Sequence, residues 1–298
     1  MSQLIITLIP AVLVLIPLCI VAFPSLWLSR LKTRGKRSPL TRDLLRSPGE
    51  SLRQQLDEIN VDIDACLFMS VFVPLSIYAI FLTQLHFAKV HNPAFVAALY
   101  GFFVLLCEGY VIVKLTKALT RRNQLRLGLD AEAAIGQELN QLMLDGYRVY
   151  HDFQADKFNI DHIVIGQNGV FAVETKGKAK PKSTDDKKNW SVIYDGQALQ
   201  FPNWTERDYL PQARRQADWL AKWLSSAVGE PVVVRPALAL TGWMIDQKQP
   251  CDVILFSGKN PPFFKIKTDT PLSAAMIQRV AHQIEQKCRD VEPQAYKK

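Results

Sequence analysis

Three long apolar runs in the first 115 residues limit what this chain can fold into more than any other feature. They cover about 4–28, 65–88 and 93–115, and the first contains no charged side chain. A helix needs about 20 apolar residues to cross the hydrocarbon core of a bilayer. We therefore predict three membrane-spanning helices. A cleaved signal peptide is the alternative for the first run, but basic residues follow Leu4–Leu28 and none precedes it.

Positive charge is distributed unevenly between the segments that flank these runs. Residues 29–64 and the stretch after 116 are rich in arginine and lysine, whereas the loop between the second and third runs holds only Lys89. Positively charged loops stay in the cytoplasm. We therefore predict an integral protein of the bacterial inner (cell) membrane, with its N-terminus outside and its C-terminal domain cytoplasmic. Residues 29–64 would be a basic linker with a short amphipathic helix, its arginines lying against anionic lipid headgroups.

Glu108 lies inside the third apolar run, where an ionisable side chain is costly. It either rests neutral or paired at a helix interface, or it has a function of its own. The first interpretation is favoured, because no basic residue lies at a matching depth. The bilayer is thus an expected partner, and homo-oligomerisation through the spans is a further possibility.

The overall composition excludes some classes of protein and leaves others open. Five scattered cysteines form no CxxC pair, which argues against a disulfide framework or a structural zinc site. Lys and Arg number 36 against 28 Asp and Glu. That excess suits nucleic acid or an anionic membrane and does not distinguish them.

After a membrane region at 1–118, residues 119–298 resemble a cytoplasmic α/β domain in their hydrophobic pattern. Helices are predicted at 130–145, started by Asp130 and ended by Gly146, and at 210–227 and 270–288. Residues 166–169, Gly-Gln-Asn-Gly, favour a hairpin turn because Asn and Gly accept positive φ. The order of elements predicts a mixed sheet flanked by helices. The strands are predicted at 147–153, 160–165, 170–176, 231–240 and 252–257, with a short edge strand at 263–267.

The predicted hairpin would bring together groups that suit metal chemistry. Asp161 lies near the start of one strand and Glu174 near the end of the next, so the turn places the two carboxylates near each other. Paired carboxylates suit Mg²⁺, which takes one or two of them plus a phosphate oxygen. Lys176 projects from the same strand face as Glu174 and could assist an attacking water. The alternative is an exposed ladder of Glu and Lys on a strand surface.

A further carboxylate falls on the preceding helix. Glu132 has helical spacing from Ile135 and Leu139, which places it on the apolar, core-facing stripe. An unpaired carboxylate there is costly, and a nearby metal or lysine would relieve that cost. Glu138 lies off the stripe and is expected to be solvated, so Glu132 is the better candidate.

These residues carry a resemblance to a known family. The stretches Gly128-Leu-Asp-Ala-Glu132 and Asn159-Ile-Asp-His-Ile-Val-Ile-Gly-Gln-Asn-Gly169-Val-Phe-Ala-Val-Glu-Thr-Lys176 resemble the nuclease-related domain family, NERD, over roughly 125–225. That family is similar to restriction-endonuclease-like, PD-(D/E)xK nucleases. The resemblance implies a restriction-endonuclease-like fold preceded by a three-helix transmembrane region.

The resemblance also implies roles for individual residues. Asp161, Glu174 and Glu132 would hold Mg²⁺ or Mn²⁺, Lys176 would be the catalytic lysine, and Gln212 would help to place water or phosphate. Two positions depart from the family pattern. Ala131 stands where the family usually has Gly, and Gly177 stands where it often has a polar residue. Neither departure removes a catalytic group.

Side chains near these residues have two interpretations each. His162 should point to the sheet face opposite Asp161 and act as a packed residue rather than a ligand. A run of lysines after the site could grip phosphates, with Trp190 or Trp204 as stacking surfaces, or could form an ordinary solvated loop. The run consists of Lys178, Lys180, Lys182, Lys187 and Lys188.

These observations predict a membrane-anchored, divalent-metal-dependent nuclease that acts on nucleic acid, DNA more readily than RNA. The alternative is a membrane-tethered nucleic-acid-binding or regulatory module that keeps a nuclease fold with little activity. A third hypothesis, compatible with the first, is a membrane sensor in which Glu108 or the spans control the domain.

Overall fold

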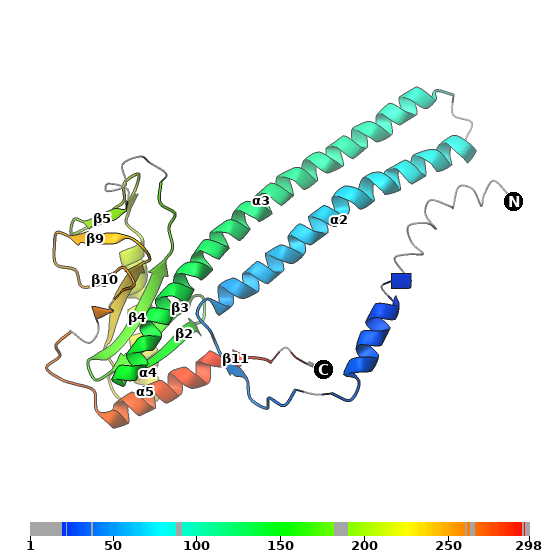
Figure 1. The fold of residues 1–298 in the computed structure, drawn as a ribbon. Helices are drawn as coiled ribbons and strands as arrows, with labels where there is room; N and C mark the ends of the chain where they lie inside the picture. Colours follow the sequence, from blue (N-terminus) through cyan, green and yellow to red (C-terminus); the bar gives the residue numbers. More distant parts are fainter. Residues whose placement is uncertain are drawn as a thin grey trace. The chain divides into compact units, whose positions relative to one another are not determined.

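The computed structural model of the chain describes residues 20–21, 23–36, 38–87, 91–181, 190–259, 261–262, 266–293 and 295. The chain divides into two compact units. The sheet unit comprises Arg42–Leu56 and Asn123–Pro293, and the helical unit comprises Met1–Thr41, Asp57–Arg122 and Gln294–Lys298. Figure 1 shows the elements of both.

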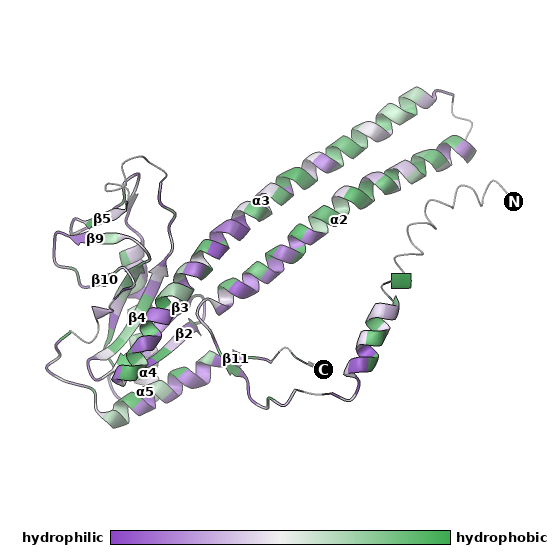
Figure 2. Ribbon diagram, viewed as in Figure 1, coloured by the Kyte–Doolittle hydropathy of each residue, from purple (hydrophilic) through white to green (hydrophobic). Residues whose placement is uncertain are grey.

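Two long helices supply the apolar surface of the helical unit. They are α2, Glu50–Phe87, and α3, Pro93–Gln141, and both are long and apolar enough to cross a membrane. Figure 2 shows hydrophobic residues gathered along the parts of these helices that lie in the helical unit. Asn92 caps α3, because its Oδ1 accepts a hydrogen bond of 3.2 Å from the Phe95 N–H.

Three membrane-spanning helices were predicted, and the described residues contain two helices that could be such spans. Most of the first predicted span, 4–28, lies outside them, although residues 23–33 are helical. Residues 65–87 of the second predicted span lie in α2 and the third predicted span, 93–115, lies in α3, and both helices are longer than these spans.

The predicted linker has a different structure from the one expected. Leu44–Leu45 form β1, which pairs antiparallel with β11, Arg289–Val291, and α2 begins directly at Glu50 instead of a separate amphipathic helix. Arg46 does not face lipid headgroups but is buried in the sheet unit. Its guanidinium finds two carboxylates there, Asp152 and Asp290, which accounts for the difference.

A five-stranded mixed sheet forms the centre of the sheet unit, as predicted. Its order is β10-β8-β4-β3-β2. The strands β2, β3 and β4 are antiparallel neighbours, whereas β4, β8 and β10 run parallel. Their bounds are Arg148–Gln154 for β2, Asn159–Gly166 for β3, Gly169–Lys176 for β4, Val234–Leu240 for β8 and Ile254–Phe256 for β10.

The turn between β3 and β4 lies where it was predicted, with Gly166 opposite Gly169. Positive φ falls on Gly169, at 129°, and not on Asn168. The hairpin therefore depends on one glycine rather than on the Asn-Gly pair.

A second sheet was not predicted. It has the order β7-β6-β5-β9 and shares a core with Leu238 and Leu240 of β8. Strands of two to four residues are too short to show an alternating pattern in the sequence. They are β5, Ser191–Tyr194, β6, Leu199–Gln200, β7, Thr205–Glu206, and β9, Met244–Gln247.

Helices cover both faces of the five-stranded sheet. The last turns of α3 and the 3₁₀ helix η1, Leu142–Asp145, pack on one face through Ile135 and Leu139. The other face is covered by α4, Tyr209–Val228, and α5, Ala274–Cys288. The predicted helix start at Asp130 is wrong, because α3 is continuous from Pro93 and no proline interrupts it. Gly146 ends the helical segment with φ 86°, as expected.

The predicted edge strand at 263–267 lies mostly outside the described residues. The four cysteines that the structure describes, Cys66, Cys107, Cys251 and Cys288, are free thiols.

Candidate active site

The β3–β4 hairpin brings Asp161 and Glu174 together. The register runs from Gly166 opposite Gly169 to His162 opposite Val173, so the next positions on the two strands are Asp161 and Glu174. The N–H of Thr175 donates to Asp161 Oδ2 at 2.7 Å, which fixes this carboxylate against β4. Asp161 and Glu174 are only 5% and 4% exposed. The hairpin thus holds two carboxylates out of bulk water.

Both oxygens of the Glu174 carboxylate are held by neighbouring side chains. Glu174 Oε1 accepts hydrogen bonds from Lys176 Nζ at 2.6 Å and from Gln212 Nε2 at 2.8 Å. Glu174 Oε2 accepts one from Gln216 Nε2 at 2.6 Å. Lys176 Nζ also donates to Gln212 Oε1 at 3.0 Å. The structure therefore brings Glu174, Lys176 and Gln212 into one hydrogen-bonded group.

Glu132 of α3 is also buried, with 7% exposed, and its Oε2 has no hydrogen-bond partner. Burial, then the nearby negative charges of Asp152 and Glu174, raise the pKa of Glu132 to about 8. Burial, followed by Glu174 and Glu132, likewise raises the pKa of Asp161 well above its usual value. The three carboxylates of Glu132, Asp161 and Glu174, hereafter the acidic cluster, therefore repel one another in a dry setting.

Gln216 and Tyr209 also belong to this site, and neither was predicted as a site residue from the sequence. Gln216 is buried, and its Oε1 is a buried oxygen without a hydrogen-bond partner. The Tyr209 ring lies 4.9 Å from Lys176 Nζ. A signal existed for Gln216: it follows Gln212 by one helical turn and lies on the apolar stripe of α4 with Ala213 and Leu220.

A second buried network stands beside the acidic cluster and was also missed. Asp152 Oδ2 accepts hydrogen bonds from Arg46 Nε at 3.0 Å, and from the backbone N–H and the hydroxyl of Ser51 at 2.7 Å each. Asp152 Oδ1 accepts one from Asn159 Nδ2 at 2.7 Å. Arg46 Nη1 donates to both oxygens of Asp290 at 3.0 Å. This Arg46–Asp152 network fastens residues 46–51 and β11 to β2.

The same N-terminal segment contacts the helix that carries Glu132. The backbone N–H of Gly49 forms a hydrogen bond with the Glu132 carboxylate. A Cβ on Gly136 would lie 2.4 Å from the Pro48 ring, so glycine is what allows this approach. The residues just before α2 thus form one wall around Glu132.

Replacing Gly49 with Ala tests this wall. Gly49 has φ 71°, and a Cβ there would lie 2.4 Å from Leu129 Cδ1. We expect Gly49→Ala to reduce the free energy of unfolding by about 1–3 kcal/mol, because the side chain meets both backbone strain and overpacking. Urea unfolding followed by tryptophan fluorescence measures the change. Gly35→Ala is the control, since it also has positive φ, 79°, but open space around it. Equal effects of the two substitutions would contradict the packing argument.

Ala131 and Gly177 lie close together in the structure. A Cβ on Gly177 would lie 2.6 Å from Ala131 Cβ and 2.7 Å from the Leu127 carbonyl oxygen. A larger side chain at 177 would therefore collide with α3. Ala131 and Gly177 therefore form one close contact between α3 and the chain after β4.

His162 lies on the face opposite the acidic cluster, as predicted, in a buried pair with His151. Their Nδ1 atoms are 2.9 Å apart, and His151 Nε2 lies 3.0 Å from Asn140 Oδ1 on α3. One of the two Nδ1 atoms must donate and the other accept, so at least the accepting ring is neutral in this arrangement. Burial lowers the pKa of His151 to about 4 and holds that of His162 well below its usual value.

This pair should make stability depend on pH. The unfolded chain takes up protons on both rings below about pH 6.5, whereas folded His151 resists protonation until about pH 4. Stability should therefore fall as the pH falls through that window, because the unfolded state binds more protons. Ring resonances of ¹³C-histidine-labelled protein check the cause directly. Titration of the His151 ring above pH 6 would contradict the prediction.

The residues present can be compared with what a divalent metal needs. Among the described residues, no three His, Cys, Asp or Glu side chains are grouped as a metal site. Lys176 instead occupies one oxygen of Glu174. Mg²⁺, however, requires only one or two carboxylates, and takes its other ligands from water and phosphate. The unpaired buried Oε2 of Glu132 and the raised pKa values of Glu132 and Asp161 fit a site that a cation would complete.

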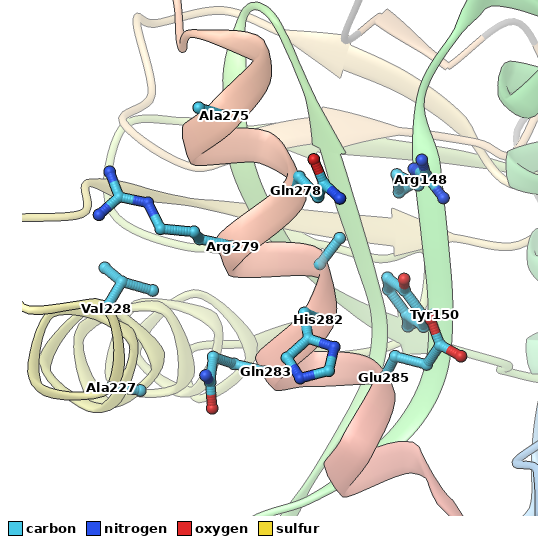
Figure 3. Close-up of a pocket in the computed structure, with 11 residues that line it drawn as sticks. Arg148, Tyr150, Ala227, Val228, Ala275, Gln278, Arg279, His282, Gln283 and Glu285 are labelled. Atoms are coloured by element: carbon cyan, nitrogen blue, oxygen red, sulfur yellow. The ribbon is translucent and has the colours of Figure 1, made fainter.

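A groove of about 590 Å³ lies elsewhere in the sheet unit, between β2, α4 and α5 (Figure 3). Arg148 and Tyr150 of β2 line it together with Arg279 and Glu285 of α5. Arg279 pairs with Glu230 at 2.8 Å, and Glu285 pairs with Arg289 at 2.7 Å. None of the predicted site residues lines this groove, so the acidic cluster is the better candidate for chemistry.

The sheet unit is thus a mixed α/β fold with a buried cluster of acids, one lysine and two glutamines. Within it, residues 127–241 match the family model of the nuclease-related domain, NERD. That match confirms the resemblance carried by the β3–β4 hairpin and covers every predicted site residue. No curated protein and no solved structure matches the chain.

Proposed function

We propose that this chain is a membrane-anchored, divalent-metal-dependent nuclease that hydrolyses phosphodiester bonds, with DNA as its preferred substrate. The observation that carries the proposal is the acidic cluster with Lys176 at its edge, inside a region that matches a nuclease-related domain. Three buried carboxylates side by side cost stability, and the pKa values of Glu132 and Asp161 are raised there. A protein keeps such an arrangement most readily where a bound cation or substrate offsets the cost.

The side chains of the site have separate proposed roles. Asp161 and Glu174 would hold Mg²⁺ or Mn²⁺, with Glu132 as a third carboxylate, directly or through water. When bound, such an ion activates a water molecule and stabilises negative charge on the phosphate. The hydrogen bond from Thr175 N–H keeps Asp161 in place. Gln212 and Gln216 orient the Glu174 carboxylate from α4.

Lys176 has the most direct chemical role of the residues at this site. Its ammonium lies between Glu174 Oε1 and Gln212 Oε1, at 2.6 and 3.0 Å. From there it would orient the attacking water and stabilise the charge that develops on the phosphate oxygens. In the structure this ammonium shares Glu174 Oε1 with Gln212 Nε2, so Lys176 and Gln212 together hold the carboxylate.

The proposed membrane anchoring rests on α2 and α3. The most apolar stretch of each helix is almost entirely exposed rather than packed against protein. With the charge distribution described above, the sheet unit would lie in the cytoplasm, where it meets DNA. A reporter fused after Lys298 checks the orientation. Activity of an extracytoplasmic reporter at that position would contradict it.

Purified protein incubated with plasmid and linear DNA, with and without Mg²⁺ or Mn²⁺, tests the proposed activity. We expect cleavage that depends on the metal and stops on chelation. DNA binding without cleavage under either metal would overturn the enzyme and leave the alternative, a tethered binding or regulatory module. The ion pair between Lys176 and Glu174 is the observation that favours this alternative, since it satisfies part of the site without a metal.

A further inference from the structure

The chain that follows β4 carries lysines at alternate positions. Lys176 ends the strand, and Lys178 and Lys180 are exposed in the irregular segment after it. Residues two apart along a non-helical chain are separated by up to roughly 7 Å. Successive phosphates along an extended nucleic-acid strand are separated by a similar step. The row begins at the proposed cleavage centre.

Aromatic rings accompany each of these ammonium groups. Lys176 and Lys178 lie 4.9 and 5.7 Å from the centroid of Tyr209. Lys180 lies 5.9 Å from the centroid of Trp190 and 5.7 Å from that of Trp243. Among the described residues, the ion pairs include neither Lys178 nor Lys180. Within the part of the chain that the structure describes, both exposed ammonium groups therefore lack a carboxylate partner.

A rigid aromatic base supports this row. Trp243 is 1% exposed, and its Nε1 donates to the Lys178 carbonyl oxygen at 3.3 Å. Phe201 and Trp204 stack in parallel at 4.3 Å, and both meet the Trp243 ring edge-on. Trp190 differs from Trp243 because 44% of it is exposed. Trp243 therefore holds the segment in place, whereas Trp190 has an exposed ring that a ligand could contact.

We propose that Lys178, Lys180 and Trp190 form a binding track for single-stranded nucleic acid that leads away from Lys176. The lysines would contact successive phosphates, and a base would stack on Trp190. Stacking on a ring needs an unpaired base, whereas a duplex keeps its base faces hidden, so the track selects single strands. This inference rests on the proposed function for its starting point. Lys182, Lys187 and Lys188, which the sequence placed in the same run, lie outside the described residues.

Cation–π packing alone is the competing explanation for this row. It would stabilise the fold slightly, by the amount that exposed cation–π pairs usually contribute. It would not predict binding of a ligand, nor a difference between single strands and duplexes. Binding measurements therefore separate the two explanations.

The test uses the full chain in detergent micelles, in metal-free buffer that prevents cleavage. Fluorescence anisotropy measures the Kd for a labelled single-stranded oligodeoxynucleotide of about 16 nucleotides and for its duplex. We expect Trp190→Ala to weaken single-strand binding by roughly 5- to 100-fold, with duplex binding unchanged and single-strand binding restored by Trp190→Phe. The Lys178→Gln, Lys180→Gln double variant should lower the slope of log K against log salt by about 1.4, for two phosphates. Lys222→Gln, an exposed lysine on α4, is the matched control.

Each result decides the proposal independently of the nuclease assay. Single-strand affinity and salt slope that stay at wild-type values in both variants would overturn the track, even if the enzyme cleaves DNA. Equal loss of duplex and single-strand binding in Trp190→Ala would overturn the preference for single strands, and so would wild-type protein that binds neither. Binding that responds as expected in a protein that never cleaves would support the track and overturn only the nuclease.

Discussion

Lys176→Ala should reduce metal-dependent cleavage by about 10²- to 10³-fold or more, the usual loss when one charge-stabilising group is removed from a reaction centre. The reason is geometric. Lys176 Nζ is the ammonium that lies within hydrogen-bond distance of Glu174, and Gln212 holds it from the other side. Initial rates at saturating Mg²⁺ measure the effect.

A lysine in a similar ion pair provides the control. Lys248 pairs with Asp246 at 2.7 Å, almost the Lys176–Glu174 distance of 2.6 Å, but both residues of this pair are exposed. Lys248→Ala should leave the rate unchanged, because an exposed pair contributes little. Thermal melting of Lys176→Ala shows whether the fold survives. A folded Lys176→Ala protein that cleaves at the wild-type rate would exclude Lys176 from the chemistry.

Much of this site could be predicted because it lies in local sequence. The hairpin turn and the period of the strands fix which residues face each other, so Asp161, Glu174 and Lys176 could be grouped from spacing alone. Glu132 was recognisable as a carboxylate on an apolar stripe. In both cases the decisive contacts follow from an element and its immediate neighbour.

The parts that sequence reasoning missed depend on distant contacts. Arg46 and Asp152 are 106 residues apart, and nothing in either neighbourhood indicates that they meet. The basic stretch around Arg46 matched the pattern of a membrane-surface linker, and only tertiary structure shows that this arginine is buried. Gln216 could have been found, because a glutamine on a buried helical stripe needs a partner.

The second large effect concerns stability: Arg46→Ala should reduce the free energy of unfolding by about 3–5 kcal/mol. Asp152 is 0% exposed, and Arg46 is the cation that pairs with it. Removing the guanidinium would leave a buried carboxylate without its cation and would also release Asp290. Urea unfolding of the detergent-solubilised protein measures the change.

Two further variants isolate the charge as the cause. Arg53→Ala removes an exposed arginine of the same segment, paired with Glu50 at 3.3 Å, and should change the free energy of unfolding by less than about 1 kcal/mol. Asp152→Asn in the Arg46→Ala background should recover part of the loss, since it removes the unpaired charge. A loss for Arg46→Ala no larger than that for Arg53→Ala would refute the argument. The negative charge of Asp152 also raises the pKa of Glu132. The Arg46–Asp152 network, which holds the residues before α2, is therefore electrostatically coupled to the acidic cluster through Asp152.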